Sequence, residues 1–365
     1  MKSRWCPTSS VSTLVVLMTL ALPLLGGVLP SMAQPHDPNL VWRVAETSLQ
    51  DYAQSPPVSG RLTVAGSDTM QTMMVKLAAG FSGFYPDTAI AVEGGGSSEA
   101  IREFMFGIAE QRRGDKGRKF GHEGASKAAM LASSRPLTAD ERKRFASRHG
   151  DDPLEIPIAM DAVAVYVHAE NPLQGLTLDQ VRAIFTGAVT TWGQLGMQEG
   201  WKKQPIRAYG RDNRSGTREY FTETVLKGES FRTDVQEFGG SAMEVLAIAR
   251  DPVGIGYLGM GFQSSMTRVV PIARQEGEPF VVPDPETVSK GTYPLSRALY
   301  LYVNQDPQEK FNPLIREFLT FINSKNGQHL VAAARFVPLS PAQIKKNLAL
   351  ISGGASIAGR AADGQ

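Results

Sequence analysis

The sequence has almost no cysteine and no marked excess of either charge. Its 365 residues include a single cysteine, Cys6, so an intrachain disulfide and a site built from several thiolates are both excluded. Lys and Arg number 38 against 36 Asp and Glu, which gives a formal net charge of +2. A nucleic-acid-binding protein needs a surplus of basic residues on one surface, and this near balance argues against such a partner. A small anionic ligand stays compatible, because a local site can be positive in a nearly neutral protein.

Common enzyme signatures are also missing. The sequence contains no G-x-x-x-x-G-K-[ST] loop, no H-E-x-x-H pair and no G-x-S-x-G turn, so the usual nucleotide-binding, zinc-protease and serine-hydrolase patterns are absent. Its five histidines are scattered, without the spacing of metal ligands. We therefore expect no catalytic residues, no metal site and no cofactor, and we interpret the chain as a binding protein rather than an enzyme.

The N-terminus has the pattern of an exported protein. Lys2 and Arg4 precede an apolar run at 11–29, which is followed by a motif of small residues that ends at Ala33. This order predicts a cleavable signal peptide over residues 1–33 and a periplasmic mature protein. The alternative is an uncleaved membrane anchor, since the run is nearly long enough to span a bilayer. Proline and glycine near the end of the run favour cleavage, and the only cysteine precedes the run, so it is not a lipid-attachment site.

Short apolar segments alternate with amphipathic ones through most of the chain. Residues 62–65, 90–92 and 156–159 have the length and composition of buried strands, while 69–84 and 139–146 have apolar residues at helical spacing. This alternation predicts an α/β fold with parallel or mixed sheets.

Two further apolar segments resemble each other. Residues 162–167 and 297–303 each read as a strand, and each is followed within a few residues by Asn or Asp and then Pro. They are either two buried strands that end in turns or a matched pair of strands that cross between two lobes. The pattern alone leaves both interpretations open.

Three segments fall outside this alternation. Residues 34–58 contain four prolines and are expected to form an arm or linker. The stretch near 105–125 is glycine-rich and carries a cluster of Lys and Arg, which predicts a solvated surface loop, with a contact surface for a partner or an anionic membrane as the alternative. Residues 351–365 are rich in Gly, Ala and Ser and predict a flexible tail.

Three places repeat one design, in which a short strand is followed by a Gly/Ser/Thr turn and then by a helix. They lie at 64–70, 92–99 and 211–218, and the third turn adds three arginines, Arg211, Arg214 and Arg218. The first N–H groups of a helix have no partner within it, and the helix dipole adds partial positive charge there. One such turn is an ordinary helix cap. Three in one chain, one of them rich in arginine, predict a convergent site for an oxyanion.

A fourth segment combines serine with arginine. Ser134 and Arg135 follow a short apolar run, and an arginine beside a serine suits bidentate contact with a tetrahedral oxyanion. The alternative is a surface turn that precedes the helix at 139–146.

Taken in order, these motifs resemble the phosphate-binding proteins of bacterial phosphate ABC transporters, and most closely their pseudomonad-type branch. The resemblance rests on GSDTM at 66–70, GGSS at 95–98, SRPL at 134–137, DAVAVYVH at 161–168, GLT at 175–177, TWGQLG at 191–196, GR at 210–211 with SGT at 215–217, GIGY at 254–257 and GTYPLSR at 291–297. These motifs extend from about residue 60 to about residue 340, nearly the whole mature chain.

This resemblance implies a two-lobed, type II periplasmic binding protein fold, with mixed sheets flanked by helices and two hinge crossover strands. It places the first lobe at 59–158 plus 296–350 and the second at 159–295. The implied function is high-affinity binding of inorganic phosphate in the cleft between the lobes and delivery to an ABC-type permease, by a monomer. The alternatives are another tetrahedral oxyanion, such as sulfate or molybdate, or a surface interaction protein that retains the binding fold.

The resemblance also implies a set of phosphate-binding residues. They are Asp68, Thr69, Met70, Ser97, Ser134, Arg135, Arg211, Ser215, Gly216 and Thr217. By motif position, Thr69 and Met70 present backbone N–H and hydroxyl donors, and Ser97 donates from the second helix. Arg211 and the SGT motif hold the ligand from the other lobe.

One position departs from the family pattern. Some members have an aspartate where Ser134 stands here, and that carboxylate accepts the proton of hydrogen phosphate and thereby excludes sulfate. Our hypothesis is that Asp68, in the first turn, supplies the acceptor instead. The alternative is that Asp68 only caps a helix and has no contact with the ligand.

Overall fold

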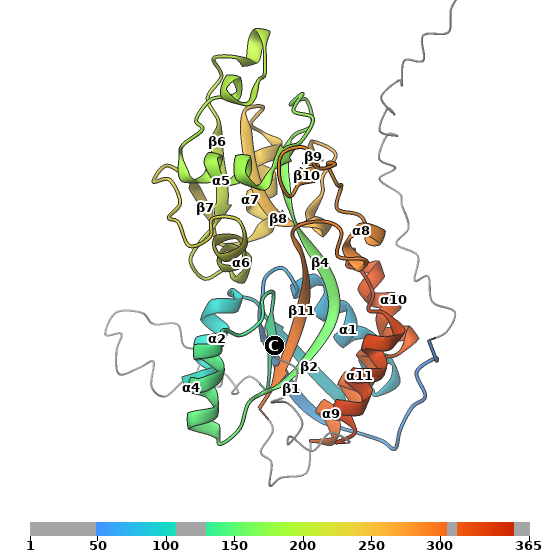
Figure 1. The fold of residues 1–365 in the computed structure, drawn as a ribbon. Coiled ribbons are helices and arrows are strands. Elements are labelled where there is room, and N and C mark those ends of the chain that lie inside the picture. The colour runs from blue at the N-terminus through green and yellow to red at the C-terminus, as the bar shows by residue number, and fades with distance from the viewer. Residues whose placement is uncertain (1–48, 107–128, 305–311, 354–365) are drawn as a thin grey trace, which may run out of the picture. The chain divides into compact units, whose positions relative to one another are not determined.

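A computed structural model describes residues 49–106, 129–304 and 312–353 (Figure 1). The predicted signal peptide at 1–33 and most of the predicted basic loop near 105–125 lie outside these residues. The predicted tail also lies outside them apart from 351–353, where Ile351 is still helical and buried. Among the described residues, no helix combines the length and hydrophobicity that are needed to cross a membrane.

Strands and helices alternate along the described chain, as the apolar segments predict. The strands are β1 (Gly60–Gly66), β2 (Thr88–Glu93), β3 (Met130–Ser133), β4 (Leu154–His168), β5 (Leu176–Thr177), β6 (Arg207–Arg211), β7 (Gln236–Phe238), β8 (Gly254–Gly259), β9 (Thr267–Val270), β10 (Ile272–Ala273) and β11 (Ser296–Val303). The helices are α1 (Gln71–Phe84), α2 (Ser97–Phe106), α4 (Ala139–His149), α5 (Leu178–Thr186), α6 (Gly216–Thr224), α7 (Ser241–Ala249), α8 (Pro285–Ser289), α9 (Pro313–Ile322), α10 (Lys325–Ala333) and α11 (Pro341–Ile351), with short 3-10 turns at Trp192–Leu195, Glu199–Trp201 and Met260–Phe262.

Nine of the strands form one mixed sheet, which confirms the predicted α/β class. The order is β2-β1-β3-β11-β4-β8-β6-β7, with β9 paired to β4. β1 is parallel to β2 and β3, and β6 is parallel to β7 and β8. β4 and β11 lie next to each other in the middle and run antiparallel, from the pair Ser296↔Ala162 to the pair Val303↔Leu154.

β4 corrects one sequence prediction. The segments 156–159 and 162–167 were expected to be separate strands, but they form one 15-residue strand. Met160 and the charged Asp161 separate these two apolar segments in the sequence. The strand continues because Arg297, directly opposite on β11, forms a buried ion pair with Asp161 (2.8 Å). A partner that is distant in sequence thus neutralises the charge that appeared to interrupt the strand.

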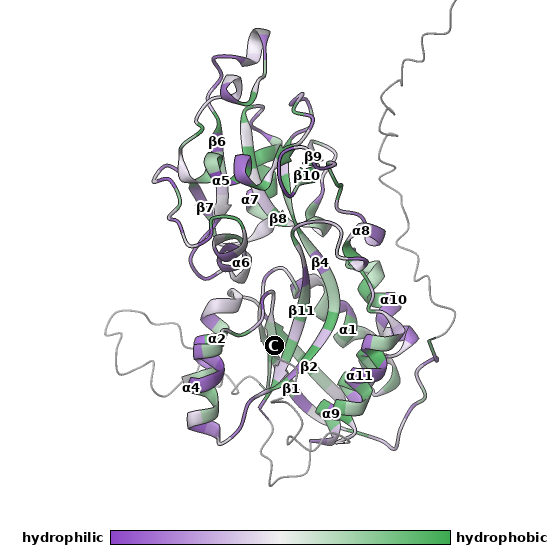
Figure 2. Ribbon diagram, viewed as in Figure 1, coloured by the Kyte–Doolittle hydropathy of each residue, from purple (hydrophilic) through white to green (hydrophobic). Residues whose placement is uncertain are grey.

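The buried side chains form two large hydrophobic cores; β4 contributes to both, and the chain that leads into β11 passes from the second core to the first. Ile158 and Ala159 of β4 pack in the first core, with β1, α1, α9 and α10, while Val163 packs in the second, with β6, β8 and α5. On the other strand, Leu299 belongs to the first core, and Leu295, just before β11, belongs to the second. In Figure 1, β4 runs through both groups of elements, and Figure 2 marks hydrophobic stretches along it in green. The two similar segments are therefore crossover strands and not two strands of one core.

The predicted arm at 34–58 is described from residue 49 onward. Tyr52 is buried, and its hydroxyl bonds to Tyr85 (2.9 Å) and to the carboxylate of Glu317 on α9. Its ring also makes an edge contact with Phe321 (5.3 Å between centroids). These contacts attach the end of the arm to the first core.

Candidate anion-binding site

The four segments that the sequence singles out are brought together in the structure. Hydrogen bonds connect them in turn, at Gly96 N to Gly66 O (3.0 Å), Ser98 N to Arg214 O (3.1 Å), Thr69 Oγ1 with Thr217 Oγ1 (3.1 Å) and Ser134 N to Ser97 Oγ (3.1 Å). The first, second and fourth segments pack with the first core, and the third precedes α6 of the second core. The predicted convergence is therefore present.

Four hydroxyl groups lie at this junction, and all are almost fully buried. Thr69, Thr217, Ser97 and Ser134 are between 1 and 2% exposed. They form two pairs, since Ser97 Oγ and Ser134 Oγ are 3.2 Å apart and the two threonine oxygens are 3.1 Å apart. Each hydroxyl can donate one proton and accept at two lone pairs, so the site offers several adaptable donors away from bulk water.

The start of α6 supplies backbone donors. Ser215 caps the helix by accepting from Arg218 N (3.4 Å), so the N–H groups of Gly216 and Thr217 are left without a partner in the helix. A Cβ atom on Gly216 would lie 2.6 Å from Ser97 Oγ and 2.9 Å from Ser134 Oγ. Glycine is thus needed here for the close approach of the helix start to the serine pair, and this geometry suits an anion.

Arg211 is the buried cation of the site. Its side chain is 1% exposed, and its guanidinium donates to Asp68 Oδ2 (3.0 Å), Gly239 O (2.9 Å), Ser241 Oγ (2.8 Å) and Phe238 O (3.3 Å). These bonds hold the group in one orientation at the end of β6. A guanidinium fixed in this way presents its remaining N–H donors in a set direction.

Asp68 does not cap a helix. The cap position of α1 is Met70, and no side chain caps that helix. The carboxylate of Asp68 instead accepts from Gly95 N (3.0 Å) with one oxygen and from Arg211 with the other. The capping alternative is therefore wrong, and the carboxylate lies beside the buried cation.

Two predicted binding residues have other partners in the structure. The N–H of Met70 donates to Ser67 O (3.0 Å), so this donor is used within the turn, and the Met70 side chain is fully buried in the first core. Arg135 is 2% exposed, so it is not part of a surface turn either. Its guanidinium bonds bidentately to Glu141 on α4 (2.7 and 2.8 Å) and also to Glu219 on α6.

Arg135 therefore acts as a link between segments. Glu141 holds it from the start of α4, and Glu219 reaches it from the second core, where Glu219 also accepts from Ser98 Oγ (2.5 Å). These carboxylates raise the pKa of Arg135 further against the effect of its burial, so the group stays charged. In this structure the guanidinium of Arg135 is thus paired with two carboxylates, and its predicted contact with an anion stays a prediction.

The other two arginines of the third turn point elsewhere. Arg214 is exposed and pairs with Asp212 (2.6 Å). Arg218 pairs with Glu237 (2.6 Å) and lies over the ring of Phe231. Of the three arginines in this turn, Arg211 alone is buried at the junction.

Sequence reasoning missed an ion pair next to the site. Arg297 donates to Asp161 through Nε (3.1 Å) and Nη2 (2.8 Å), and Nη2 also donates to Thr217 Oγ1 (3.1 Å). The sequence held one signal for this pair: the acidic Asp161 adjoins one of the two similar apolar segments, and the basic Arg297 begins the other. It could be used only once the register of β4 against β11 was known.

A buried carboxyl lies close to Arg211 without bonding to it. Glu244 on α7 is fully buried, and its Oε1 accepts from Tyr257 N (3.0 Å). Burial raises the pKa of Glu244 to about 8, against the opposing charge of Arg211. The group is therefore neutral at pH 7.

This carboxyl makes stability depend on pH. Between about pH 4.5 and pH 8 the unfolded chain has lost the Glu244 proton and the folded chain retains it, so stability falls as pH rises through this window and then levels off. We expect Glu244→Gln to gain stability relative to the unmodified protein as pH rises from 5 to 8, on the order of a few kcal/mol. Urea unfolding of anion-free protein at both pH values measures the change, and a stability difference that is the same at both would contradict it.

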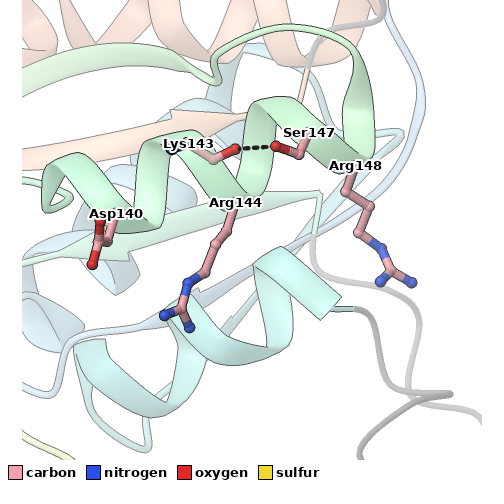
Figure 3. Close-up of a pocket in the computed structure, with 5 residues that line it drawn as sticks. All are labelled: Asp140, Lys143, Arg144, Ser147 and Arg148. Carbon is pink, nitrogen blue, oxygen red and sulfur yellow. Dashed lines mark hydrogen bonds between the residues drawn. The ribbon is translucent and has the colours of Figure 1, made fainter.

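A surface pocket on α4 contains none of these residues. Asp140, Lys143, Arg144, Ser147 and Arg148 line it, and Figure 3 shows them along one helix, with Ser147 Oγ bonded to Lys143 O (2.7 Å). All five are exposed, so their charges are screened by water. Among the described residues, no group of His, Cys, Asp and Glu could hold a metal ion.

Comparison with known proteins gives three findings. A family model described as the PBP superfamily domain matches residues 51–326. The chain is 35% identical over 307 residues to the phosphate-binding protein PstS of Pseudomonas aeruginosa, which covers 82% of this chain and 89% of the relative. A Clostridium perfringens protein described as a phosphate ABC transporter substrate-binding protein, solved with phosphate bound, is similar with a TM-score of 0.62 at 25% identity, over 77% of this chain and all of the other.

A further solved structure agrees at the level of the fold. It is an ABC-type phosphate transport receptor from Vibrio cholerae, with a TM-score of 0.57 at 22% identity over 76% of this chain and 99% of that one.

Proposed function

Because this chain belongs to the PBP superfamily and, within it, to the phosphate-binding proteins PstS, we propose that it binds inorganic phosphate at the junction of its two cores and delivers it to an ABC-type permease. The single observation that carries this proposal is the convergence of the four turns. Buried hydroxyls, the start of α6 and the guanidinium of Arg211 meet there, and together they match the needs of a tetrahedral oxyanion.

The proposed contacts are a subset of the residues expected from sequence. Thr69, Ser97, Ser134 and Thr217 donate through hydroxyls, and Gly216 donates through its backbone. Arg211 supplies the charge from one side, and Ser215 shapes the helix start. Met70 and Arg135 support the site through the protein contacts described above and are not proposed as direct ligands.

Asp68 is proposed as the group that distinguishes phosphate from sulfate. Ser134 is neutral, so the acceptor for the proton of hydrogen phosphate has to come from another residue. Asp68 is ionisable, is one-fifth exposed, and already lies 3.0 Å from Arg211. A ligand without a proton would place an unprotonated oxygen against this carboxylate, and the repulsion between the two negative groups disfavours its binding.

The remaining roles follow from the same proposal. We infer an exported, periplasmic monomer with two lobes near 59–158 plus 296–350 and 159–295, joined by β4 and β11, that closes on its ligand and performs no catalysis. Closure about crossover strands would bury the ligand and form one surface, to which both lobes contribute, for the permease.

Isothermal titration tests the proposal. The exported form of the protein is stripped of bound anion and titrated with phosphate and then with sulfate at neutral pH. We expect one-to-one binding of phosphate and no response to sulfate. Binding of sulfate or molybdate in place of phosphate would keep the binding fold and overturn the ligand. Binding of no oxyanion would overturn the transport role and favour an interaction protein that retains the fold.

A further inference from the structure

We propose that Arg297, held by Asp161, is a positioning residue that holds the hydroxyl of Thr217 in place, so that the Thr217–Thr69 hydroxyl pair presents one donor to the bound anion. This inference rests on the proposed function and adds a determinant of affinity that the motif resemblance does not assign. Arg297 and Asp161 lie outside the four anion-binding turns, on the two crossover strands.

The ion pair is completely buried. The side chain of Arg297 is 2% exposed and that of Asp161 is not exposed at all. Arg297 Nε and Nη2 donate to the same carboxylate oxygen, Asp161 Oδ2, at 3.1 and 2.8 Å. Burial raises the pKa of Asp161 while Arg297 opposes that rise through its charge and hydrogen bonds. An ion pair in this setting is costly to desolvate, so its presence calls for a role besides stability.

Arg297 also makes two contacts with the start of α6. Nη2 donates to Thr217 Oγ1 at 3.1 Å, and the guanidinium lies 5.5 Å from the centre of the Tyr220 ring. Thr217 and Tyr220 are three residues apart, so they share one face of the helix. Tyr220 in turn donates to Ser296 O (3.0 Å), next to Arg297 on the strand. The first turn of α6 is thus attached directly to β11.

The hydrogen bond from Arg297 restricts what Thr217 can do. A guanidinium only donates, so one lone pair of Thr217 Oγ1 is filled by Arg297. The second bond joins Thr217 Oγ1 to Thr69 Oγ1, and one of the two hydroxyl protons is used in it. The threonine that accepts in this bond keeps its own hydroxyl proton. That proton is free to bond to a further acceptor. The pair therefore presents one hydroxyl donor, as an anion requires.

The position of the ion pair connects this donor to the crossing point of the two cores. Ala159 belongs to the first core and Ala162 to the second, and Asp161 lies between them. Gly259 leaves no space there, since a Cβ atom would lie 3.2 Å from Thr69 Cγ2 and 3.3 Å from Asp161 Oδ2. Arg297 Nη1 is buried and bonds to none of the described residues, so it can serve one more acceptor beside Thr217.

A double-mutant cycle on phosphate affinity tests the inference. The paired change Asp161→Asn with Arg297→Gln removes both charges together and leaves no unpaired ion. We expect it to weaken phosphate binding by about ten- to a hundredfold, as for loss of a charge-assisted hydrogen bond. In a Thr217→Val background, the same paired change should weaken phosphate binding by less than about threefold, because the hydroxyl that Arg297 holds is absent. Arg297→Lys, which keeps a charged donor, should recover part of the affinity.

Controls separate this role from folding and from the proposed function. Asp251→Asn with Arg207→Gln removes another Arg–Asp pair (3.0 Å) that contacts none of the site residues, and it should leave affinity unchanged. Circular dichroism confirms that each variant is folded; if the neutral pair does not fold, Arg297→Lys is taken through the same cycle. Equal losses with and without the Thr217 hydroxyl would overturn the inference and leave the ion pair as scaffold. Failure of the unmodified protein to bind phosphate would overturn the proposed function instead, and the cycle would be run with the oxyanion that it does bind.

Discussion

Replacing Gly216 by alanine is expected to weaken phosphate binding by about a hundredfold while the fold remains intact. The added methyl group would lie 2.6 Å from both Cβ and Oγ of Ser97 and 2.9 Å from Ser134 Oγ. The helix start would have to move away from the serine pair, and overpacking of this kind costs roughly 1–3 kcal/mol in addition to the lost anion contacts. Titration calorimetry measures the loss.

The fold should tolerate this change because Gly216 is not in a left-handed conformation, and alanine favours a helix more than glycine does. Gly83→Ala on α1 is the matched control, since no atom lies within 4 Å of the added methyl group. It should bind phosphate like the unmodified protein. If Gly216→Ala binds within about threefold of that value, the approach of α6 to the serine pair does not form the anion site.

Replacing Asp68 by asparagine is expected to reduce the preference for phosphate over sulfate by about a hundredfold. Asparagine keeps the size of the side chain but offers an N–H where the carboxylate accepts, so the proton of hydrogen phosphate loses its partner. Breaking a fully buried ion pair costs about 3–5 kcal/mol. Asp68 is 20% exposed, so the cost of breaking its ion pair with Arg211 should be smaller than this range. Competition of sulfate against phosphate, measured at one pH, gives the ratio directly.

The control for this change is Asp212→Asn. Asp212 lies in the third turn and pairs with the exposed Arg214, so its replacement makes the same change in charge without altering the buried groups. It should leave the preference intact. An Asp68→Asn protein that still excludes sulfate would show that another group accepts the proton, and Asp161, with its unbonded Oδ1, would be the next to examine.

The turns could be predicted from sequence because their chemistry is local. A Gly/Ser/Thr segment before a helix exposes N–H groups whatever the rest of the chain does, and Ser215 and Gly216 behave in this way. The role of Arg135 could not be predicted, because it depends on Glu219, which is 84 residues distant in sequence. A lone arginine in a sequence looks like an anion ligand until its carboxylate partners are known.

The strand break was mispredicted for a related reason. A charged residue inside an apolar run usually ends a buried strand, and Asp161 would do so by itself. Its partner Arg297 is 136 residues away and becomes adjacent only through the register of β4 and β11. Periodicity identified both segments as strands, but it carries no information on which residues lie opposite each other.

The central position of β11 has a consequence for synthesis of the chain. β11 lies between β3 and β4 in the sheet, yet it comes after the elements of the second core in the sequence. The polypeptide is synthesised from its N-terminus onward. The second core can therefore form while β3 and the first half of β4 still lack β11, the strand that lies between them. Their unpaired edges would be exposed during this interval, and exposed edges invite association with other chains. A protein of this topology therefore depends on rapid delivery of its last segment, from β11 onward, and a nascent chain arrested before β11 is the species most at risk of aggregation.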